Sequence, residues 1–268
     1  GTPRRNCCHT RTDIPSAAMH TLQRLLSLVL TITLGGASSL AAQDLAINNV
    51  RIIVGTGQVI EQGTIVIRGG RIVSASAGNT AAPGVRALDG RGLTAVAGYI
   101  DAHRHIVQGG GRGAGAGAAD SWLRDSAPAR MQEFLEAGYT TLMSAGGAAE
   151  PVVALKKAID SGQMKGPRII PSGPLQLGNA TPESARETIR KLAAADIHFT
   201  GEVNVNSFMP DPKQLEALAA AIDEGKKVGV DLAIHASSVV AMRAAVRIGV
   251  PKLVHTPHFQ WMSDADAQ

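Results

Sequence analysis

Hydrophobic and polar positions follow two different patterns along the chain. In residues 45–93, short runs rich in β-branched residues, such as TIVIR and RIVSA, alternate with turns. The pair Gly69-Gly70 between those two runs is typical of a two-residue hairpin turn, in which both residues need a positive φ. The pattern predicts a small β-domain over residues 43–94.

From residue 95 onward, strand-like runs alternate with helical ones. Thr181 followed by Pro182 is typical of a helix N-cap and the first helical residue. Six strands separated by five helices indicate parallel strands with right-handed crossovers, either in a barrel or in a doubly wound sheet. Strands are expected over 95–105, 139–147, 167–173, 197–205, 230–237 and 251–257, and helices over 122–137, 150–161, 181–195, 211–229 and 239–248.

The first 42 residues are expected to lie outside the mature fold. Residues 1–18 precede Met19 and are expected to be non-native upstream sequence. Residues 19–42 have the pattern of a secretory signal peptide, with a short apolar stretch, small residues and cleavage after Ala41 or Ala42. The apolar stretch is short for a membrane span, and an N-terminal anchor or a buried helix is the alternative. We expect export to the periplasm or the extracellular space.

Composition and charge are those of an ordinary soluble globular protein. The chain has 268 residues, of which 44% are hydrophobic and 18% charged. Without residues 1–42, it has 22 basic and 21 acidic side chains, a balance that does not favour a nucleic-acid partner. Cys7 and Cys8 also lie in that segment, so the mature chain has no cysteine for a disulfide.

The positions of histidine and glutamate favour a barrel over an open sheet. The carboxyl ends of barrel strands converge on one mouth, whereas those of an open sheet lie along an edge. His103 and His105 are two residues apart and should share one face of their strand, with Arg104 on the other. Imidazole and carboxylate ligands suit zinc, or iron or manganese. The candidate metal ligands at predicted strand ends are His103, His105, Glu202, His235 and His255.

Three stretches carry a family resemblance: GYIDAHRH at 98–105, EGKKVGVDLAIHASS at 224–238 and AAVRIGVPKLVHTP at 244–257. In this order and spacing they resemble strands one, five and six of the amidohydrolase superfamily of metal-dependent hydrolases. The β-rich segment before them is similar to the small sandwich domain of imidazolonepropionase-like members. The resemblance implies an α/β fold, a (β/α)8-type barrel over 95–268 with a small N-terminal β-sandwich domain over 43–94. That sandwich is expected to be partial, without its return strands.

Two departures from the family pattern change what is expected. Strand four has no lysine to bridge two metals, so Glu202 is the available carboxylate, as in the adenine deaminases; a solvated glutamate at a strand end is the alternative. The family's general base is an aspartate after strand eight, whereas this chain ends at Gln268, just beyond strand six. Asp231 begins strand five at the opposite rim and cannot replace it. We expect a barrel truncated after about six strands, a catalytic base beyond residue 268, and an N-terminal fragment that is inactive alone.

Two further histidines have weaker assignments. His258 follows strand six in a loop at the mouth and is a candidate for substrate binding, with a plain surface histidine as the alternative. His198 lies four residues before Glu202, deeper in the same strand. We expect it to face the core or a helix rather than a metal.

The resemblance implies a metal-dependent hydrolase that cleaves a C–N bond in an amide, cyclic amide or dipeptide with metal-activated water. One or two zinc ions would bind, His103 and His105 holding one and His235 and His255 a second if Glu202 bridges. A deaminase of a heterocyclic amine and a non-catalytic metal-binding barrel are the alternatives. The expected partner is a small-molecule substrate, with no membrane association after signal removal; a homo-oligomer is left open.

Overall fold

The structure is a computed structural model that describes residues 44–107 and 117–268. The described residues form two compact units, residues 44–96 and residues 97–268 without 108–116. The segment predicted as a signal peptide and the residues before it lie outside the described residues. In the part of the chain that is described, no helix combines the length and the apolar character needed to cross a membrane.

The first unit is a single five-stranded sheet. Its strands are β1 (Leu45–Ile53), β2 (Val59–Arg68), β3 (Arg71–Ala77), β4 (Arg86–Asp89) and β5 (Thr94–Ala95). The strand order is β3-β2-β1-β4, and β5 also pairs with β1. Gly69 and Gly70 have φ of 54° and 74° and connect the paired residues Arg68 and Arg71, which confirms the predicted hairpin.

Every described strand of the unit pairs with β1 or β2, so residues 44–96 form one connected sheet. That these residues are part of a β-sandwich stays a prediction. The sheet has a small core, which consists of Val50, Ile52 and Ile65 with a few partly buried neighbours. The β-domain was predicted to end at Thr94. In the structure Thr94 pairs with Arg51, and Ala95 pairs with Ile52.

The second unit contains the alternating strands and helices. The order is β6 (Tyr99–Arg104), α2 (Ala118–Asp125), α3 (Ala127–Glu136), β7 (Tyr139–Ser144), α4 (Ala149–Asp160), β8 (Arg168–Ile170), α5 (Pro182–Ala194), β9 (Phe199–Asn204), α6 (Pro212–Val228), β10 (Asp231–His235), α7 (Val239–Arg247), β11 (Lys252–Val254) and a short α8 (Asp264–Ala267). This confirms the predicted α/β class, with each predicted strand shorter than expected.

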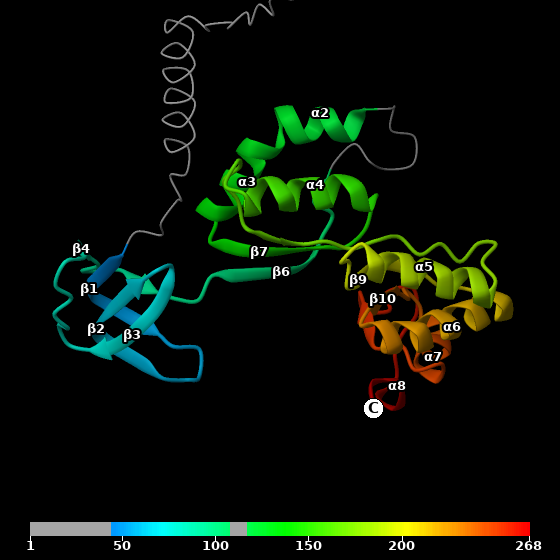
Figure 1. Cartoon of the computed structure of the whole chain (residues 1–268). Helices are drawn as coiled ribbons and strands as arrows, with labels where there is room; N and C mark the ends of the chain where they lie inside the picture. Colours follow the sequence, from blue (N-terminus) through cyan, green and yellow to red (C-terminus); the bar gives the residue numbers. More distant parts are fainter. Residues whose placement is uncertain (1–43, 108–116) are drawn as a thin grey trace, which may run out of the picture. The chain divides into compact units, whose positions relative to one another are not determined.

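One predicted helix is two helices in the structure. The expected helix over 122–137 is divided at Ser126 into α2 and α3 (Figure 1). Pro128 lies in the first turn of α3, where its missing N–H costs nothing. Its ring would clash with the carbonyl of residue 124 in a continuous helix, so the chain starts a new helix there. The predicted N-cap is confirmed, because the side-chain oxygen of Thr181 accepts a hydrogen bond from the backbone of Ser184.

The six strands of the second unit are parallel to their neighbours and follow one another in sequence order. They form two three-stranded sheets, β6-β7-β8 and β9-β10-β11. A single parallel bridge, between Gly173 and Thr200, joins β9 to the chain that follows β8. Among the described residues β6 and β11 are not paired, so the strands form partial sheets and not a closed barrel.

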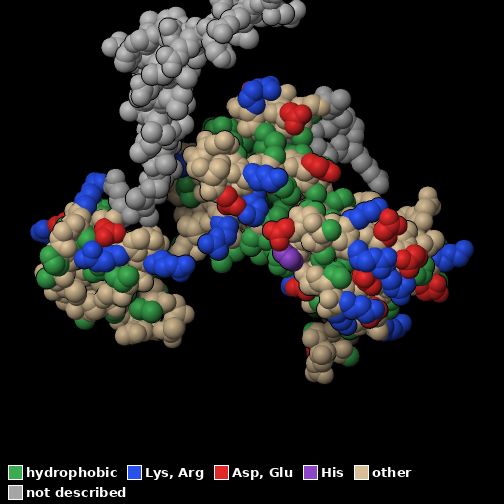
Figure 2. Space-filling model, viewed as in Figure 1, with side chains coloured by type: hydrophobic (Ala, Val, Ile, Leu, Met, Phe, Trp, Pro, Cys, Tyr) green, Lys and Arg blue, Asp and Glu red, His purple; other side chains and the backbone are tan. Residues whose placement is uncertain are grey.

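Helices cover the sheets and supply most of the core. The larger cluster lies between α5, α6, α7 and the β9-β10 sheet, with Leu218, Ile234 and Ile189 fully buried. The smaller one includes Met131 and Leu142, beneath the helices drawn beside β6 and β7 in Figure 1. Side chains of both charge signs are interspersed over the outer face of α5 and α6 (Figure 2).

Gly201 allows β9 to approach the loop that follows β7. A Cβ atom at this position would lie 2.6 Å from the Cα of Gly146 and 3.1 Å from the carbonyl oxygen of Ala145. Both of these are backbone atoms, which cannot rotate away. The next residue, Glu202, donates its backbone N–H to that same Ala145 carbonyl at 2.8 Å. The two sheets therefore touch through a contact that only glycine permits.

We predict that Gly201→Ala destabilises the protein, because its methyl group must push β9 away from the 145–147 backbone. Overpacking of this kind costs about 1–3 kcal/mol, measurable as a lower free energy of unfolding in urea. Gly178→Ala is the matched control, since no atom lies within 4 Å of the added Cβ. Equal effects of the two substitutions would contradict the close approach.

Candidate metal centre

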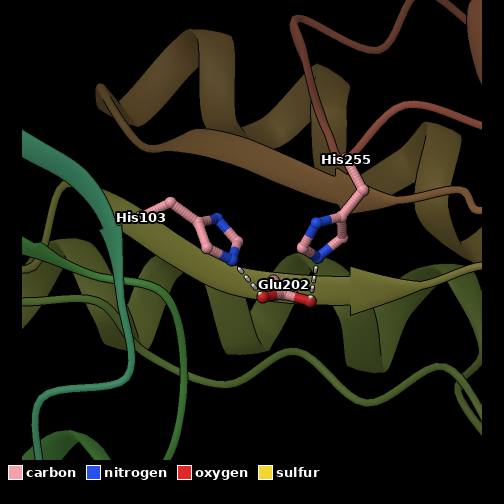
Figure 3. Close-up of side chains that lie close together, drawn as sticks. All are labelled: His103, Glu202 and His255. Atoms are coloured by element: carbon pink, nitrogen blue, oxygen red, sulfur yellow. Dashed lines mark hydrogen bonds and ion pairs between the residues drawn. The ribbon is translucent and has the colours of Figure 1, made fainter.

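The carboxylate of Glu202 is surrounded by four histidines. On one side, the Nε2 atoms of His103 and His105 lie 2.7 Å and 3.1 Å from Oε1. On the other, His235 Nδ1 lies 2.7 Å and His255 Nε2 3.3 Å from Oε2. Figure 3 shows His103 and His255 directed at the two oxygens of Glu202. The structure therefore brings together all five residues that the sequence predicted as ligands; their binding of a metal stays a prediction.

The strands explain why these side chains meet. His103 and His105 both reach Glu202, whereas the guanidinium of Arg104 lies on the other side, 5.0 Å from the ring centroid of Phe134. This alternation is the one expected of an extended chain. In the second sheet, β9 and β10 are parallel and in register, with Glu202 opposite Ala233 and His235 two residues further along. Parallel strands thus present their functional groups at one edge.

His255 reaches the site through an unusual backbone turn. It directly follows β11 and has φ of 66°, in the left-handed region. For residues other than glycine this conformation is uncommon and mildly strained, although histidine adopts it more often than most. The imidazole is also packed edge-on against the rings of His103 and His235, with centroids 4.8 Å and 4.7 Å away. The left-handed conformation thus occurs at the residue whose imidazole reaches Oε2 of Glu202.

The environment of Glu202 keeps it ionised. Burial is the largest single influence and would raise the pKa of this carboxyl, whose side chain is only 13% exposed. Hydrogen bonds from His235 and His255, together with the charges of His103 and His235, outweigh burial and lower the pKa. An anionic carboxylate with an imidazole nitrogen pair at each oxygen is a strong ligand set for a cation.

Two neighbouring residues support the site and were not identified from the sequence. The hydroxyl of Ser237 lies 2.8 Å from Nε2 of His235, which leaves Nδ1 of that ring facing Glu202. Asp101 accepts a hydrogen bond from the backbone N–H of His103 at 3.0 Å. Each lies two residues from a predicted ligand, and this i, i+2 spacing on a strand is the signal that could have found it.

Among the described residues, the other two histidines lie apart from the carboxylate of Glu202. His258 contacts the carbonyl of Thr256 at 3.2 Å, and its backbone N–H donates to Ser237, so its role in substrate binding stays a prediction. His198 was expected to face the core or a helix rather than a metal. Its ring contacts Asp196 at 3.0 Å and, at 3.1 Å, the carbonyl oxygen of Gly229, which is the C-cap residue of α6. The contact with a helix is confirmed, whereas the side chain is 55% exposed and does not face the core.

The donor atoms fit a divalent cation. One nitrogen each from His103 and His255 and one oxygen from Glu202 lie within 4.8 Å of one another. Zinc binds imidazole nitrogen at about 2.0–2.1 Å, so two ligands of one ion lie roughly 3–4 Å apart. The two oxygens of Glu202 face different histidine pairs, and the three grouped donors include one histidine of each pair. The residues that would hold one ion or two are His103, His105, Glu202, His235 and His255.

Comparison with known proteins agrees with this fold and donor set. Residues 94–267 match the amidohydrolase family. Because the match covers more than half of the chain, the protein belongs to the amidohydrolase family. Members of this family are metal-dependent hydrolases that act on C–N bonds. The resemblance seen in the sequence is thereby confirmed.

Individual relatives are more distant or match only in part. The chain is 44% identical to an adenine deaminase of Escherichia coli strain K12 over 68 residues, 25% of this chain and 11% of the deaminase. A putative prolidase from Bifidobacterium longum has a similar structure, with a TM-score of 0.66, 26% identity and coverage of 80% of this chain and 54% of that one. Molinate hydrolase shares the fold at a TM-score of 0.66 and 20% identity, over 80% and 58%. The chain thus spans little more than half of these solved structures.

We predict that Glu202→Gln and His255→Ala each weaken zinc binding by more than about 100-fold. Loss of groups that merely support a ligand already costs 10–100-fold in affinity, and direct ligands contribute more. Isothermal titration of the metal-free protein with zinc measures the effect. His198→Ala is the matched control and should bind zinc like the wild type, because its ring contacts Asp196 instead of the centre. Unchanged zinc affinity in Glu202→Gln would refute the assigned donor set.

Proposed function

We propose that the protein is a metal-dependent hydrolase that cleaves the C–N bond of an amide, cyclic amide or dipeptide. The observation that carries the proposal is the Glu202 carboxylate with two imidazole nitrogens at each oxygen. Membership of the amidohydrolase family supports the reaction class. The relative with 26% identity is a putative prolidase, which supports a dipeptide among the candidate substrates. Zinc is the proposed metal, because imidazole and carboxylate ligands suit it.

The residues of this chain would hold the metal and prepare it for reaction. A bound divalent cation supplies Lewis acidity, which polarises a carbonyl group and makes water a nucleophile near neutral pH. Glu202 provides negative charge at the centre, and Ser237 fixes the ring of His235 so that Nδ1 is presented to the metal. The position of His258 after β11 suits contact with the substrate.

We further propose that the partial sheets belong to a (β/α)8-type barrel. Six parallel strands in sequence order, with ligands at their carboxyl ends, support this architecture. The proton acceptor would be an aspartate outside these 268 residues. Two carboxylates of the described residues lie at the centre, and both already accept hydrogen bonds: Glu202 from His235, and Asp101 from the backbone of His103.

A deaminase of a heterocyclic amine is the second candidate. It is favoured by the 44% identity to adenine deaminase over 68 residues. Both reactions use water and break a C–N bond, but they release different products. Amide hydrolysis gives a carboxylate and an amine, whereas deamination gives ammonia and a carbonyl-containing ring.

Product analysis with the zinc-loaded full-length protein distinguishes the two candidates. We predict carboxylate and amine from amides and dipeptides, and no ammonia from adenine. Changing both His103 and His105 to alanine should lower kcat/KM by at least about 100-fold, because those residues supply two ligands. His198→Ala should retain activity. Ammonia as the only product, or full turnover by the double variant, would overturn the proposal.

We also propose that the protein is exported. The support is the pattern of residues 19–42, in which an apolar stretch is followed by small residues. When the gene is expressed with its own start, N-terminal sequencing of exported material should give Ala42 or Gln43 as the first residue. Recovery of a chain that still begins at Met19 would contradict cleavage.

A further inference from the structure

Two exposed phenylalanines stack on each other beyond the carboxyl ends of the strands. The rings of Phe208 and Phe259 have centroids 5.5 Å apart and planes inclined by 25°. Their residues are nonetheless 72% and 53% exposed. The two rings come from different loops, residues 205–211 after β9 and residues 255–263 after β11. A stacked pair that remains open to solvent presents an apolar surface suited to a flat or branched apolar group.

Both loops are hydrogen-bonded to the residues that follow the candidate ligand His235. The backbone N–H groups of His258 and Phe259 donate to the carbonyl of Ser237 at 2.9 Å and 3.2 Å. The hydroxyl of Ser238 donates to the carbonyl of Ser207 in the other loop. The Ser237 hydroxyl itself contacts the ring of His235. The stacked pair is therefore held by the same short segment that positions the metal-facing imidazole.

Local backbone geometry keeps the first ring at the surface. The side-chain oxygen of Asn206 accepts hydrogen bonds from the N–H groups of Phe208 and Met209, each at 3.0 Å. This turn replaces strand pairing and projects the two apolar side chains outward, with Met209 78% exposed. The second ring lies four residues after His255, so their Cα atoms are at most about 14 Å apart. That span is the size of a small substrate.

The charge of the two loops indicates what the surface binds. Residues 205–211 and 255–263 contain no lysine or arginine, and the first of these loops ends in the anionic side chain of Asp211. The loops contribute the apolar side chains of Met209 and Trp261, the latter 94% exposed, and the imidazole of His258, whose ring centroid lies 4.3 Å from that of Phe259. A substrate carboxylate placed here would lose water without gaining a lysine or arginine partner. A neutral apolar group would lose only unfavourable contact with water.

We propose that Phe208 and Phe259 form a subsite for an uncharged aromatic or branched alkyl group of the substrate, beside the bond to be cleaved. This inference rests on the proposed function and narrows it to neutral amides with an apolar substituent. Dipeptides with a free carboxylate at this position are disfavoured. The two rings are specificity-determining residues and take no part in the chemistry.

Equilibrium binding to the metal-free full-length protein tests the subsite without turnover. The probes are acetanilide and 4-acetamidobenzoate, which differ by one carboxylate. Calorimetry should give a Kd for acetanilide at least 10-fold lower than for the acid, and acetanilide should change the fluorescence of Trp261. Phe208→Ala and Phe259→Ala should each weaken acetanilide binding about 2–12-fold, the range that corresponds to 0.5–1.5 kcal/mol for an aromatic pair.

Val246→Ala is the matched control, since this apolar side chain on α7 belongs to a residue that is 58% exposed and to neither loop. It should leave both affinities unchanged. Unaltered acetanilide binding in both phenylalanine variants, or tighter binding of the acid, would overturn the subsite. A change from dimer to monomer in Phe208→Ala without loss of acetanilide affinity would instead identify a contact between copies, and would also overturn it.

A parallel zinc titration separates this inference from the proposed function. Zinc binding without acetanilide binding would refute the subsite and leave the hydrolase proposal standing. Acetanilide binding without zinc binding would support the subsite and refute the metal centre. The phenylalanine variants should keep the zinc affinity of the wild type, because neither ring contacts the four histidines among the interactions of the described residues.

Discussion

The second unit depends on one constraint: a nearly buried carboxylate must be compensated. Glu202 is 13% exposed, and an unpaired charge at such a place would cost several kcal/mol. Four imidazoles provide the compensation, and they come from three separate parts of the chain. Each of those parts must therefore reach the same point. The strand order, the contact at Gly201 and the left-handed turn at His255 all serve that convergence.

Burial of apolar side chains offsets the free-energy cost of this polar centre. A fully buried leucine or isoleucine stabilises the fold by roughly 1.5–3 kcal/mol relative to an exposed one. Leu218, Leu232 and Ile234 are at most 1% exposed, and the last two lie on β10, the strand that ends in His235. The same strand thus contributes packing along its length and a polar group at its end. In this way β10 holds His235 at the site while its other side chains pack in the apolar core.

Much of this arrangement could be predicted from the sequence because it follows local rules. The alternation of a strand placed His103 and His105 on one face, and the Thr181-Pro182 pair located a helix start. The convergence of Glu202 with the histidines followed from the parallel strand topology, because the carboxyl ends of parallel strands lie together. Features that depend on long-range contacts were missed. The pairing of both β4 and β5 with β1 depends on contacts between distant residues, and the support given by Ser237 depends on the orientation of one imidazole ring.

The two halves of the centre depend on the fold in different ways. His103 and His105 belong to one stretch of chain, so their relative position is set by the geometry of a single extended segment. His235 and His255 come from two strands, and their relative position depends on the pairing of β10 with β11. That pairing involves only three residues on each strand, and Lys252 and Asp231 add an exposed ion pair beside it. The Oε1 side of Glu202 is consequently preorganised by local structure, whereas the Oε2 side depends on tertiary contacts.

The apolar loops hydrogen-bonded to Ser237 and Ser238 lie on the Oε2 side of Glu202. A ligand bound at these loops would therefore stabilise the half of the centre that local structure leaves less fixed.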